Sequence, residues 1–185
     1  MAYNNPTSKL ERAIRAYLIA QGKAEPENIY IANDSRTRAL PARTVIAPAF
    51  NPRYGHSSEG ECSLAIQHVF SAAIDTPETN FSTQRVLMDK MVGDTIDSFA
   101  CGDRQSLNRV ADAITAAGRA LATSDGSEQG DIDAADNADM VNFRCDWIKF
   151  AHPMLTRGRA SEDGTNWVEV VNLTAFVSNA DTDNT

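Results

Sequence analysis

Residues 61–71 alternate with a strict period of two, and this pattern limits what the chain can fold into. Cys62, Leu64, Ile66, His68 and Phe70 fall on one side, with smaller or more polar residues between them. A period of two is that of a β-strand with one buried face. Such a strand is stable only in a sheet whose apolar face is covered by other elements. The sequence therefore predicts a sheet with helices packed on it.

Four further strands complete the expected sheet. They are Ile29–Ala32, Arg43–Ala47, Met140–Phe150 and Asn166–Val177. A polar loop at Asn51–Gly60 separates the second of these from residues 61–71, which predicts a long hairpin. The alternation within 140–150 breaks phase at Ile148 and Phe150, which indicates a bulge or a change of buried face. The last strand is apolar on both sides, so we expect both of its faces to be at least partly covered.

The first helix has the clearest local signals. Ser8 and Glu11 form a capping box that predicts its start, and Gly22 predicts its end. Arg12 and Arg15 lie off the expected buried stripe. That stripe consists of Leu10, Ala13, Ile14, Tyr17 and Leu18.

Two more helices are expected in the middle of the chain. One spans about Ser82–Ala100, and the other follows a cap at Asp103 and extends to Leu121. Gly118 lies near the end of the second of these and weakens it by about 1 kcal/mol relative to alanine.

The order of expected elements is αβββααββ, which predicts an α+β fold. We expect one domain with a mixed, mainly antiparallel sheet of about five strands, packed by two or three helices. Long loops are expected at 51–60, at 124–139 and at 151–165, and a flexible tail at 178–185. No apolar run approaches the roughly 20 residues that span a bilayer, and no signal peptide is evident, so we expect synthesis in the cytoplasm.

Charge is unevenly distributed along the chain. The net charge is −8, but residues 1–50 carry seven basic and four acidic groups, whereas residues 124–185 carry four basic and twelve acidic groups. Ser124–Asp139 alone holds six acids and no base. This balance argues against nucleic-acid binding as a main task, because phosphate contacts need clustered Lys and Arg. The polarity either helps copies of the chain meet head to tail or simply keeps an acidic surface solvated.

No catalytic constellation stands out, so we expect no enzyme activity and no cofactor. Cys62 and His68 share a strand face but lie about 20 Å apart, too far for a nucleophile and its base. Cys62 and Cys145 fit buried apolar positions. The acidic stretch fails as a calcium loop, because the required glycine is Asp136 and the closing glutamate is Asn142. The competing hypothesis is a small hydrolase or ligand-binding enzyme that uses residues distant in sequence. Its candidates are His56, His152, Cys101 and the acidic loop.

The layout as a whole is more informative than any single motif. An amphipathic helix and a short strand lead into Leu40-Pro41-Ala42-Arg43, and a hairpin follows. A helix comes after Thr76-Pro77, and the last strand is approached through Asp163-Gly164 and Trp167. Over roughly residues 8–177, this arrangement resembles the tail terminator (tail completion) proteins of long-tailed bacteriophages.

The resemblance implies a structural role in the virion. Such proteins form a homo-oligomeric ring, usually a hexamer, on the last ring of the tail tube. The ring stops tube growth and joins the tube to the neck or head-completion protein, and DNA passes through it without specific binding. The implied location is the head-proximal end of the tail, with no membrane involved. Another neck or tube-associated virion protein would show many of the same features.

Two sets of residues are candidates for this role. The loop residues Arg53, Tyr54 and His56 offer a cation, an aromatic ring and a polar group suited to a subunit contact, although a plain surface loop explains them equally well. Acidic side chains suit a channel lining past which DNA must slide, or a subunit interface. These acidic candidates are Asp131, Asp133, Asp136 and Glu169.

Overall fold

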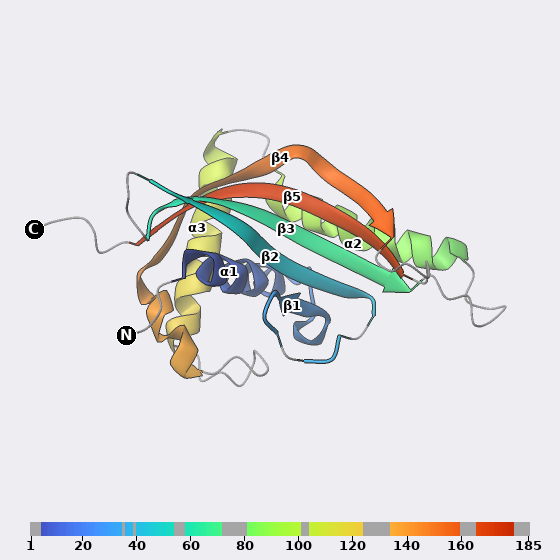
Figure 1. Cartoon of the computed structure of the whole chain (residues 1–185), viewed down its shortest axis with the longest axis horizontal. Coiled ribbons are helices and arrows are strands. Elements are labelled where there is room, and N and C mark those ends of the chain that lie inside the picture. Colours follow the sequence, from blue (N-terminus) through green and yellow to red (C-terminus); the bar gives the residue numbers. More distant parts are fainter. Residues whose placement is uncertain are drawn as a thin grey trace, which may run out of the picture.

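Five strands form one mixed sheet in the order β1-β2-β3-β5-β4 (Figure 1). The computed structural model describes residues 5–34, 36–38, 40–53, 58–71, 81–100, 104–123, 134–159 and 166–179. β1 and β2 pair in parallel, and the other three neighbouring pairs are antiparallel. The main helices and strands follow the chain in the order αβββααββ, so the expected α+β class is confirmed.

The elements have the following bounds. The helices are α1 (Pro6–Ala20), α2 (Phe81–Phe99) and α3 (Arg104–Ala120), with short 3-10 helices η1 (Pro26–Asn28), η2 (Leu121–Thr123) and η3 (Ala134–Asn142). The strands are β1 (Ile29–Ile31), β2 (Ala42–Pro52), β3 (Gly60–Ser71), β4 (Phe143–Arg159) and β5 (Asn166–Asn179).

The helix α1 begins three residues earlier than its predicted capping box. Asn5 is the N-cap, and its side chain accepts a hydrogen bond from the Thr7 amide at 3.1 Å. Pro6 follows as the first helical residue, where its missing N–H costs nothing. The capping box at Ser8 and Glu11 was therefore the wrong start. The predicted stop is confirmed, because Gly22 has a φ of 64° and its amide donates to the Ile19 carbonyl.

Several charged residues of α1 are buried, although they lie outside the predicted apolar stripe of the helix. Arg15 is 1% exposed, and its guanidinium donates to the Ile29 and Pro26 carbonyls. Arg12 is 7% exposed and bonds to η3. Glu11 accepts from the Ala47 amide at 2.8 Å, which ties α1 to β2. The helix lies between the sheet and other elements, so nearly its whole circumference is covered.

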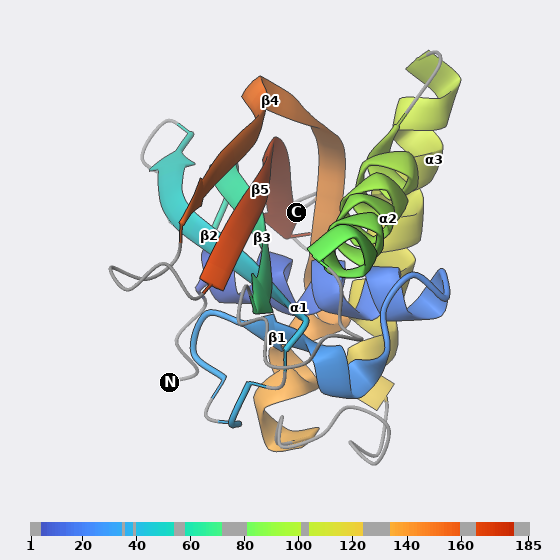
Figure 2. The ribbon, with the colours of Figure 1, turned by 90° about the vertical axis from the view of Figure 1, so that its right-hand side faces the viewer.

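All three helices pack on one face of the sheet (Figure 2), here called the inner face. Cross-strand pairing sets its apolar rows, such as Val45, Ile66 and Val171. These residues are fully buried, together with Leu10, Ile14 and Leu18 of α1. The period of two in residues 61–71 thus corresponds to the core face of a central strand, as predicted.

β4 is much longer than the predicted strand. Residues 140–142 belong to η3, and residues 151–159, expected to form a loop, continue the strand. Pairing with β5 shifts between Cys145 and Trp147 and again between Phe150 and Leu155. The first shift confirms the expected bulge. The second shift explains why residues 151–159 were not predicted as strand, because three extra residues interrupt the alternation of apolar and polar positions.

Two other predictions have clear outcomes. Cys62 and Cys145 are buried, and burial raises the pKa of each thiol to about 12. Gly118 does more than weaken α3, because a Cβ there would lie 2.7 Å from the Phe143 ring and 2.9 Å from the Ala13 Cβ. The absence of a side chain lets α1, α3 and β4 meet.

Several expectations lie outside the described residues. These are the Asp103 cap, the loop tip at 54–57, and most of the acidic loop and of the tail. Where they are described, the last two predictions are wrong: residues 134–139 of the expected loop belong to η3, and residues 178–179 of the expected tail belong to β5. Within the described part, none of the helices has the length and apolar character required to cross a bilayer.

Candidate functional site

The face of the sheet opposite the helices, here called the outer face, is the main candidate site. Its side chains are the alternate positions of β2, β3, β5 and the paired parts of β4. Most of them are partly or fully exposed, including Ala65, Gln67 and Thr174. No helix of the described part covers this face, so it is open to solvent or to a partner.

A cation–aromatic row crosses one end of the outer face and consists of Arg53, Phe176, Trp147 and Lys149. The Phe176 and Trp147 rings lie side by side across β5 and β4, with centroids 6.1 Å apart. Arg53 Cζ lies 5.9 Å from the Phe176 centroid, and Lys149 Nζ lies 4.9 Å from that of Trp147. Both rings are partly exposed, and both cations are exposed. Arginine and aromatic side chains of this kind dominate protein interfaces.

A groove of about 350 Å³ lies next to this row. Its floor is formed by small side chains of β3 and β5, among them Ser63, Ala65 and Thr174. Its walls are the two irregular strands, with Pro48 of the β2 bulge on one side and residues 151–153 of the β4 bulge on the other. The two bulges flank the pair formed by Ala65 and Asn172, so the groove is a consequence of strand irregularity.

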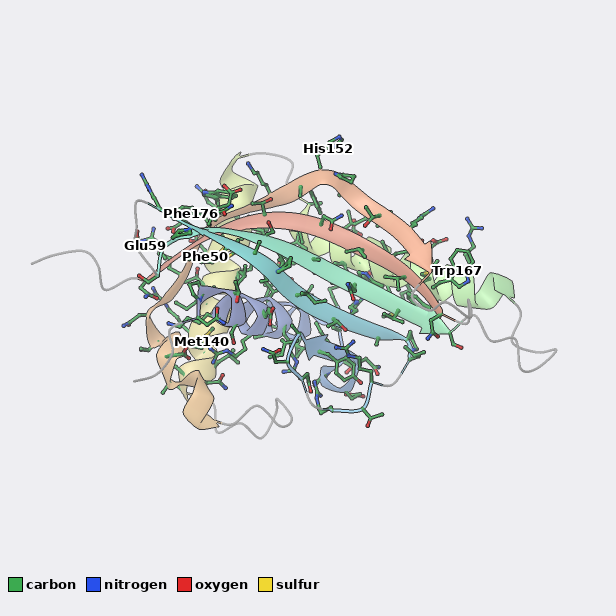
Figure 3. All side chains as sticks on the ribbon, in the orientation of Figure 1. Phe50, Glu59, Met140, His152, Trp167 and Phe176 are labelled. Carbon is green, nitrogen blue, oxygen red and sulfur yellow. The ribbon has the colours of Figure 1, made fainter. Side chains whose placement is uncertain are left out.

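Polar groups hold the β4 wall of the groove in place. Asn172 Nδ2 donates to the Pro153 carbonyl at 3.0 Å and lies 3.4 Å from Thr156 Oγ1. His152 stands at the crest of β4 and points away from the helices (Figure 3). It is exposed. The groove therefore combines hydroxyl, amide and imidazole groups with no carboxylate among its lining residues.

β4 is also an edge strand, and its exposed charges are mostly basic. In the described part of the chain, it pairs with β5 alone. Arg144, Lys149 and Arg157 are exposed, and Asp146 forms an ion pair with Arg144 at 2.9 Å. Basic side chains on an edge strand discourage nonspecific strand pairing and also create a surface for acidic partners.

A second polar cluster lies on the inner face, beneath α2. Arg43, His68, Glu169 and Arg157 are cross-strand neighbours on β2, β3, β5 and β4. Glu169 is 4% exposed, and its Oε1 lies 2.9 Å from Arg157 Nε. Glu169, expected to line a channel or a subunit interface, is instead buried within the domain, because it shares the parity of the buried Val171 and Leu173.

α2 contacts this cluster through polar groups. His68 Nε2 lies 2.8 Å from Thr95 Oγ1, and Arg43 Nη2 donates to the Met91 carbonyl at 3.0 Å. Burial and the nearby Arg43 charge lower the pKa of His68 to about 4, so the imidazole is neutral at pH 7. A neutral histidine in a covered position fits a structural role.

The structure brings together only part of the predicted site. Arg53 lies at the end of the β2–β3 hairpin, in the cation–aromatic row. Tyr54, His56, Asp131 and Asp133 lie outside the described residues, and Asp136 lies in η3 without a described side chain. Sequence reasoning missed Trp147 and Lys149. Their signal was present in the phase break of residues 140–150, which moves them to the outer face.

Metal ligands do not gather in the described part of the chain, where His, Cys, Asp and Glu form no group of three or more. The chain matches no protein-family model, and no curated protein sequence matches it.

Proposed function

We propose that this protein is a ring-forming virion assembly protein, the tail terminator that caps a phage tail tube and joins it to the neck. The observation that carries the proposal is the outer face. It combines an uncovered sheet surface, a cation–aromatic row and a long edge strand in one molecule. A sheet with helices on one face leaves its other face open to solvent or to a partner.

The element order supports the same proposal. The αβββααββ sequence of elements is the feature on which the resemblance to tail terminators rests. In a ring, each subunit presents one surface to the next, so the contact is heterologous and closes by rotation. The edge strand and the outer face of β4 and β5 provide one half of such a contact. Of the individual residues named for the enzyme hypothesis, His152 lies in the groove, and His56 and Cys101 lie outside the described residues.

Mass in solution tests the proposal directly. We expect native mass spectrometry to detect a ring, most simply a hexamer, and electron microscopy to locate it at one end of tail tubes assembled from the same virus. Trp147→Glu places a charge in the centre of the aromatic contact and should weaken subunit association by about 30-fold or more. Arg109→Glu, an exposed change on α3, is the matched control and should leave the ring intact.

A protein that stays monomeric at all concentrations and never binds tube ends would contradict the proposal. Circular dichroism of Trp147→Glu separates loss of assembly from loss of fold, because the residue is only partly buried. Binding to the tube side or to the neck alone would instead indicate another tube-associated virion protein.

The groove favours one second candidate, the binding of a small polar molecule. Its hydroxyl, amide and imidazole groups match ligands that carry several hydrogen-bonding groups. A thermal-shift screen of sugars and nucleotides would reveal a stabilising ligand. Asn172→Ala should abolish that shift, because it removes the bonds that hold the β4 wall.

A further inference from the structure

Lys149 is positioned to receive a carboxylate. Its ammonium lies over the Trp147 ring, and no ion pair joins it to a carboxylate among the described residues. The aromatic ring of Trp147 contacts one side of the Lys149 ammonium, so the other N–H donors of that ammonium point away from the ring. Arg53 adds a second cation at the other end of the row, where the exposed Glu61 of β3 is the cross-strand neighbour of Phe176. The row therefore suits an acidic segment with some apolar content.

This chain contains one segment of that chemistry, Ser124–Asp139. It carries six acidic residues, no basic residue, and Ile132 near its middle. One acid already has a partner, because Asp139 bonds to both terminal nitrogens of Arg12 at 3.1 Å. The other five are Asp125, Glu128, Asp131, Asp133 and Asp136.

The attachment points of this segment lie on the helix side of the molecule. Thr123 of η2 precedes it, and η3 packs against η2 and α3. Arg12 fixes η3 to α1 through Asn137 and Asp139. The cation–aromatic row lies on the opposite, outer face of the sheet, because Trp147 and Phe176 alternate with the buried Ile148 and Ala175. A contact between segment and row would join two copies.

We infer that the cation–aromatic row of one copy binds the acidic segment of the neighbouring copy. The inference rests on the proposed ring function and names the surfaces that meet. Charge complementarity sets the direction of the contact, with the row as receptor and the segment as ligand. Such a contact is head to tail, which is the geometry that a closed ring requires.

Charge reversal on each surface tests the contact. Arg53→Glu with Lys149→Glu reverses the row, and Asp131→Lys with Asp133→Lys reverses the segment. Each double variant should associate about tenfold more weakly than wild type, since exposed ion pairs contribute up to roughly 1 kcal/mol each. An equimolar mixture of the two variants should restore association, because alternating subunits again place opposite charges together. Arg109→Glu with Lys90→Glu, on exposed helix positions, is the matched control.

A peptide of residues 124–139 tests the inference without a ring. We expect the labelled peptide to bind the wild-type protein, and to bind the Arg53→Glu, Lys149→Glu double variant about tenfold more weakly. If rings form and cap tubes but neither double variant affects them, the inference is wrong and the proposed function stands. If the peptide binds but no ring forms, the proposed function fails alone. Absence of peptide binding, or binding of a single-stranded oligonucleotide in preference to the peptide, overturns the inference.

Discussion

His68 is fully buried on β3, with Arg43 and Glu169 as its cross-strand neighbours and Thr95 of α2 above it. A neutral imidazole has one N–H to donate. The Glu169 carbonyl can only accept, so its 3.3 Å contact with Nδ1 places the proton of the neutral His68 ring on Nδ1. Nε2 then accepts from the Thr95 hydroxyl at 2.8 Å.

The depressed pKa of His68 predicts loss of stability in acid. Its pKa is about 4 in the folded protein against an ordinary value of 6.5 for histidine, so only the unfolded chain takes up the proton between these limits. The free energy of unfolding should therefore fall as pH drops from about 6.5 to about 4, by on the order of 2 to 3 kcal/mol from this residue. Urea denaturation across this range measures it.

His68→Gln separates this effect from that of the carboxylates. Glutamine does not titrate, so the variant should lose less stability than wild type over the same pH interval. Equal slopes for both proteins would mean that His68 has the same pKa in the folded and unfolded states.

Gly118 predicts a packing clash on substitution. Gly118→Ala brings a Cβ to within 2.7 Å of the Phe143 ring, so α3 or β4 must shift. We expect a loss of about 1 to 3 kcal/mol despite the better helix propensity of alanine. Gly93→Ala on α2 is the control, because nothing lies within 4 Å of its added Cβ. It should be neutral or stabilising by up to about 1 kcal/mol. Thermal denaturation of both variants decides whether space or propensity dominates.

At the scale of elements, buried charge on α1 connects segments far apart in sequence. Arg12 reaches η3, Glu11 reaches β2, and Arg15 reaches β1 and η1. Each bond satisfies a group that would otherwise be buried without a partner, which is why the helix tolerates charge on covered sides. Through these buried charges, α1 ties η3, η1, β1 and β2 together.

Loss of the Arg12 contact should detach η3. Arg12→Ala leaves the buried Asn137 Oδ1 without this donor and Asp139 with only its longer ion pair to Lys9 at 3.9 Å, at a cost of about 1 to 3 kcal/mol. Hydrogen exchange should accelerate in residues 137–142 before it does in β3. Arg109→Ala, an exposed arginine on α3, should change neither stability nor exchange. Uniform acceleration in both regions would show that η3 unfolds only with the whole domain.

At the scale of the whole molecule, charge and shape divide between two sides. The helix side holds the attachment points of the acidic segment, and the outer face holds the exposed cations Arg53 and Lys149. This separation of acidic and basic groups is the basis of the proposed head-to-tail contact between copies.

Salt should weaken association between copies. Screening shortens the Debye length from about 10 Å at 0.1 M salt to about 3 Å at 1 M, so contacts between exposed charges lose most of their strength. We expect the dissociation constant measured by sedimentation to rise several-fold over this range, with little change in the unfolding of the monomer. Stronger association at high salt would indicate a mainly apolar contact.

Local sequence alone determined the class of fold and most of its elements. The period of two at residues 61–71, the apolar stripe of α1 and the Gly22 stop depend on neighbours along the chain, so each was readable. The end of β4 was not, because its bulge interrupts the pattern. The start of α1 was misplaced because Ser8 and Asn5 both precede a plausible first turn, and propensity does not separate them.

Tertiary structure decided where the polar residues lie. Nothing in the sequence pairs Arg12 with Asp139, buries Glu169 beside Arg157, or stacks Arg53 and Lys149 on two rings from different strands. These contacts depend on strand register and on two bulges, and a register shift of one residue exchanges the two faces. Alternation reveals that a face is buried, whereas only the assembled sheet determines which side chains meet on it.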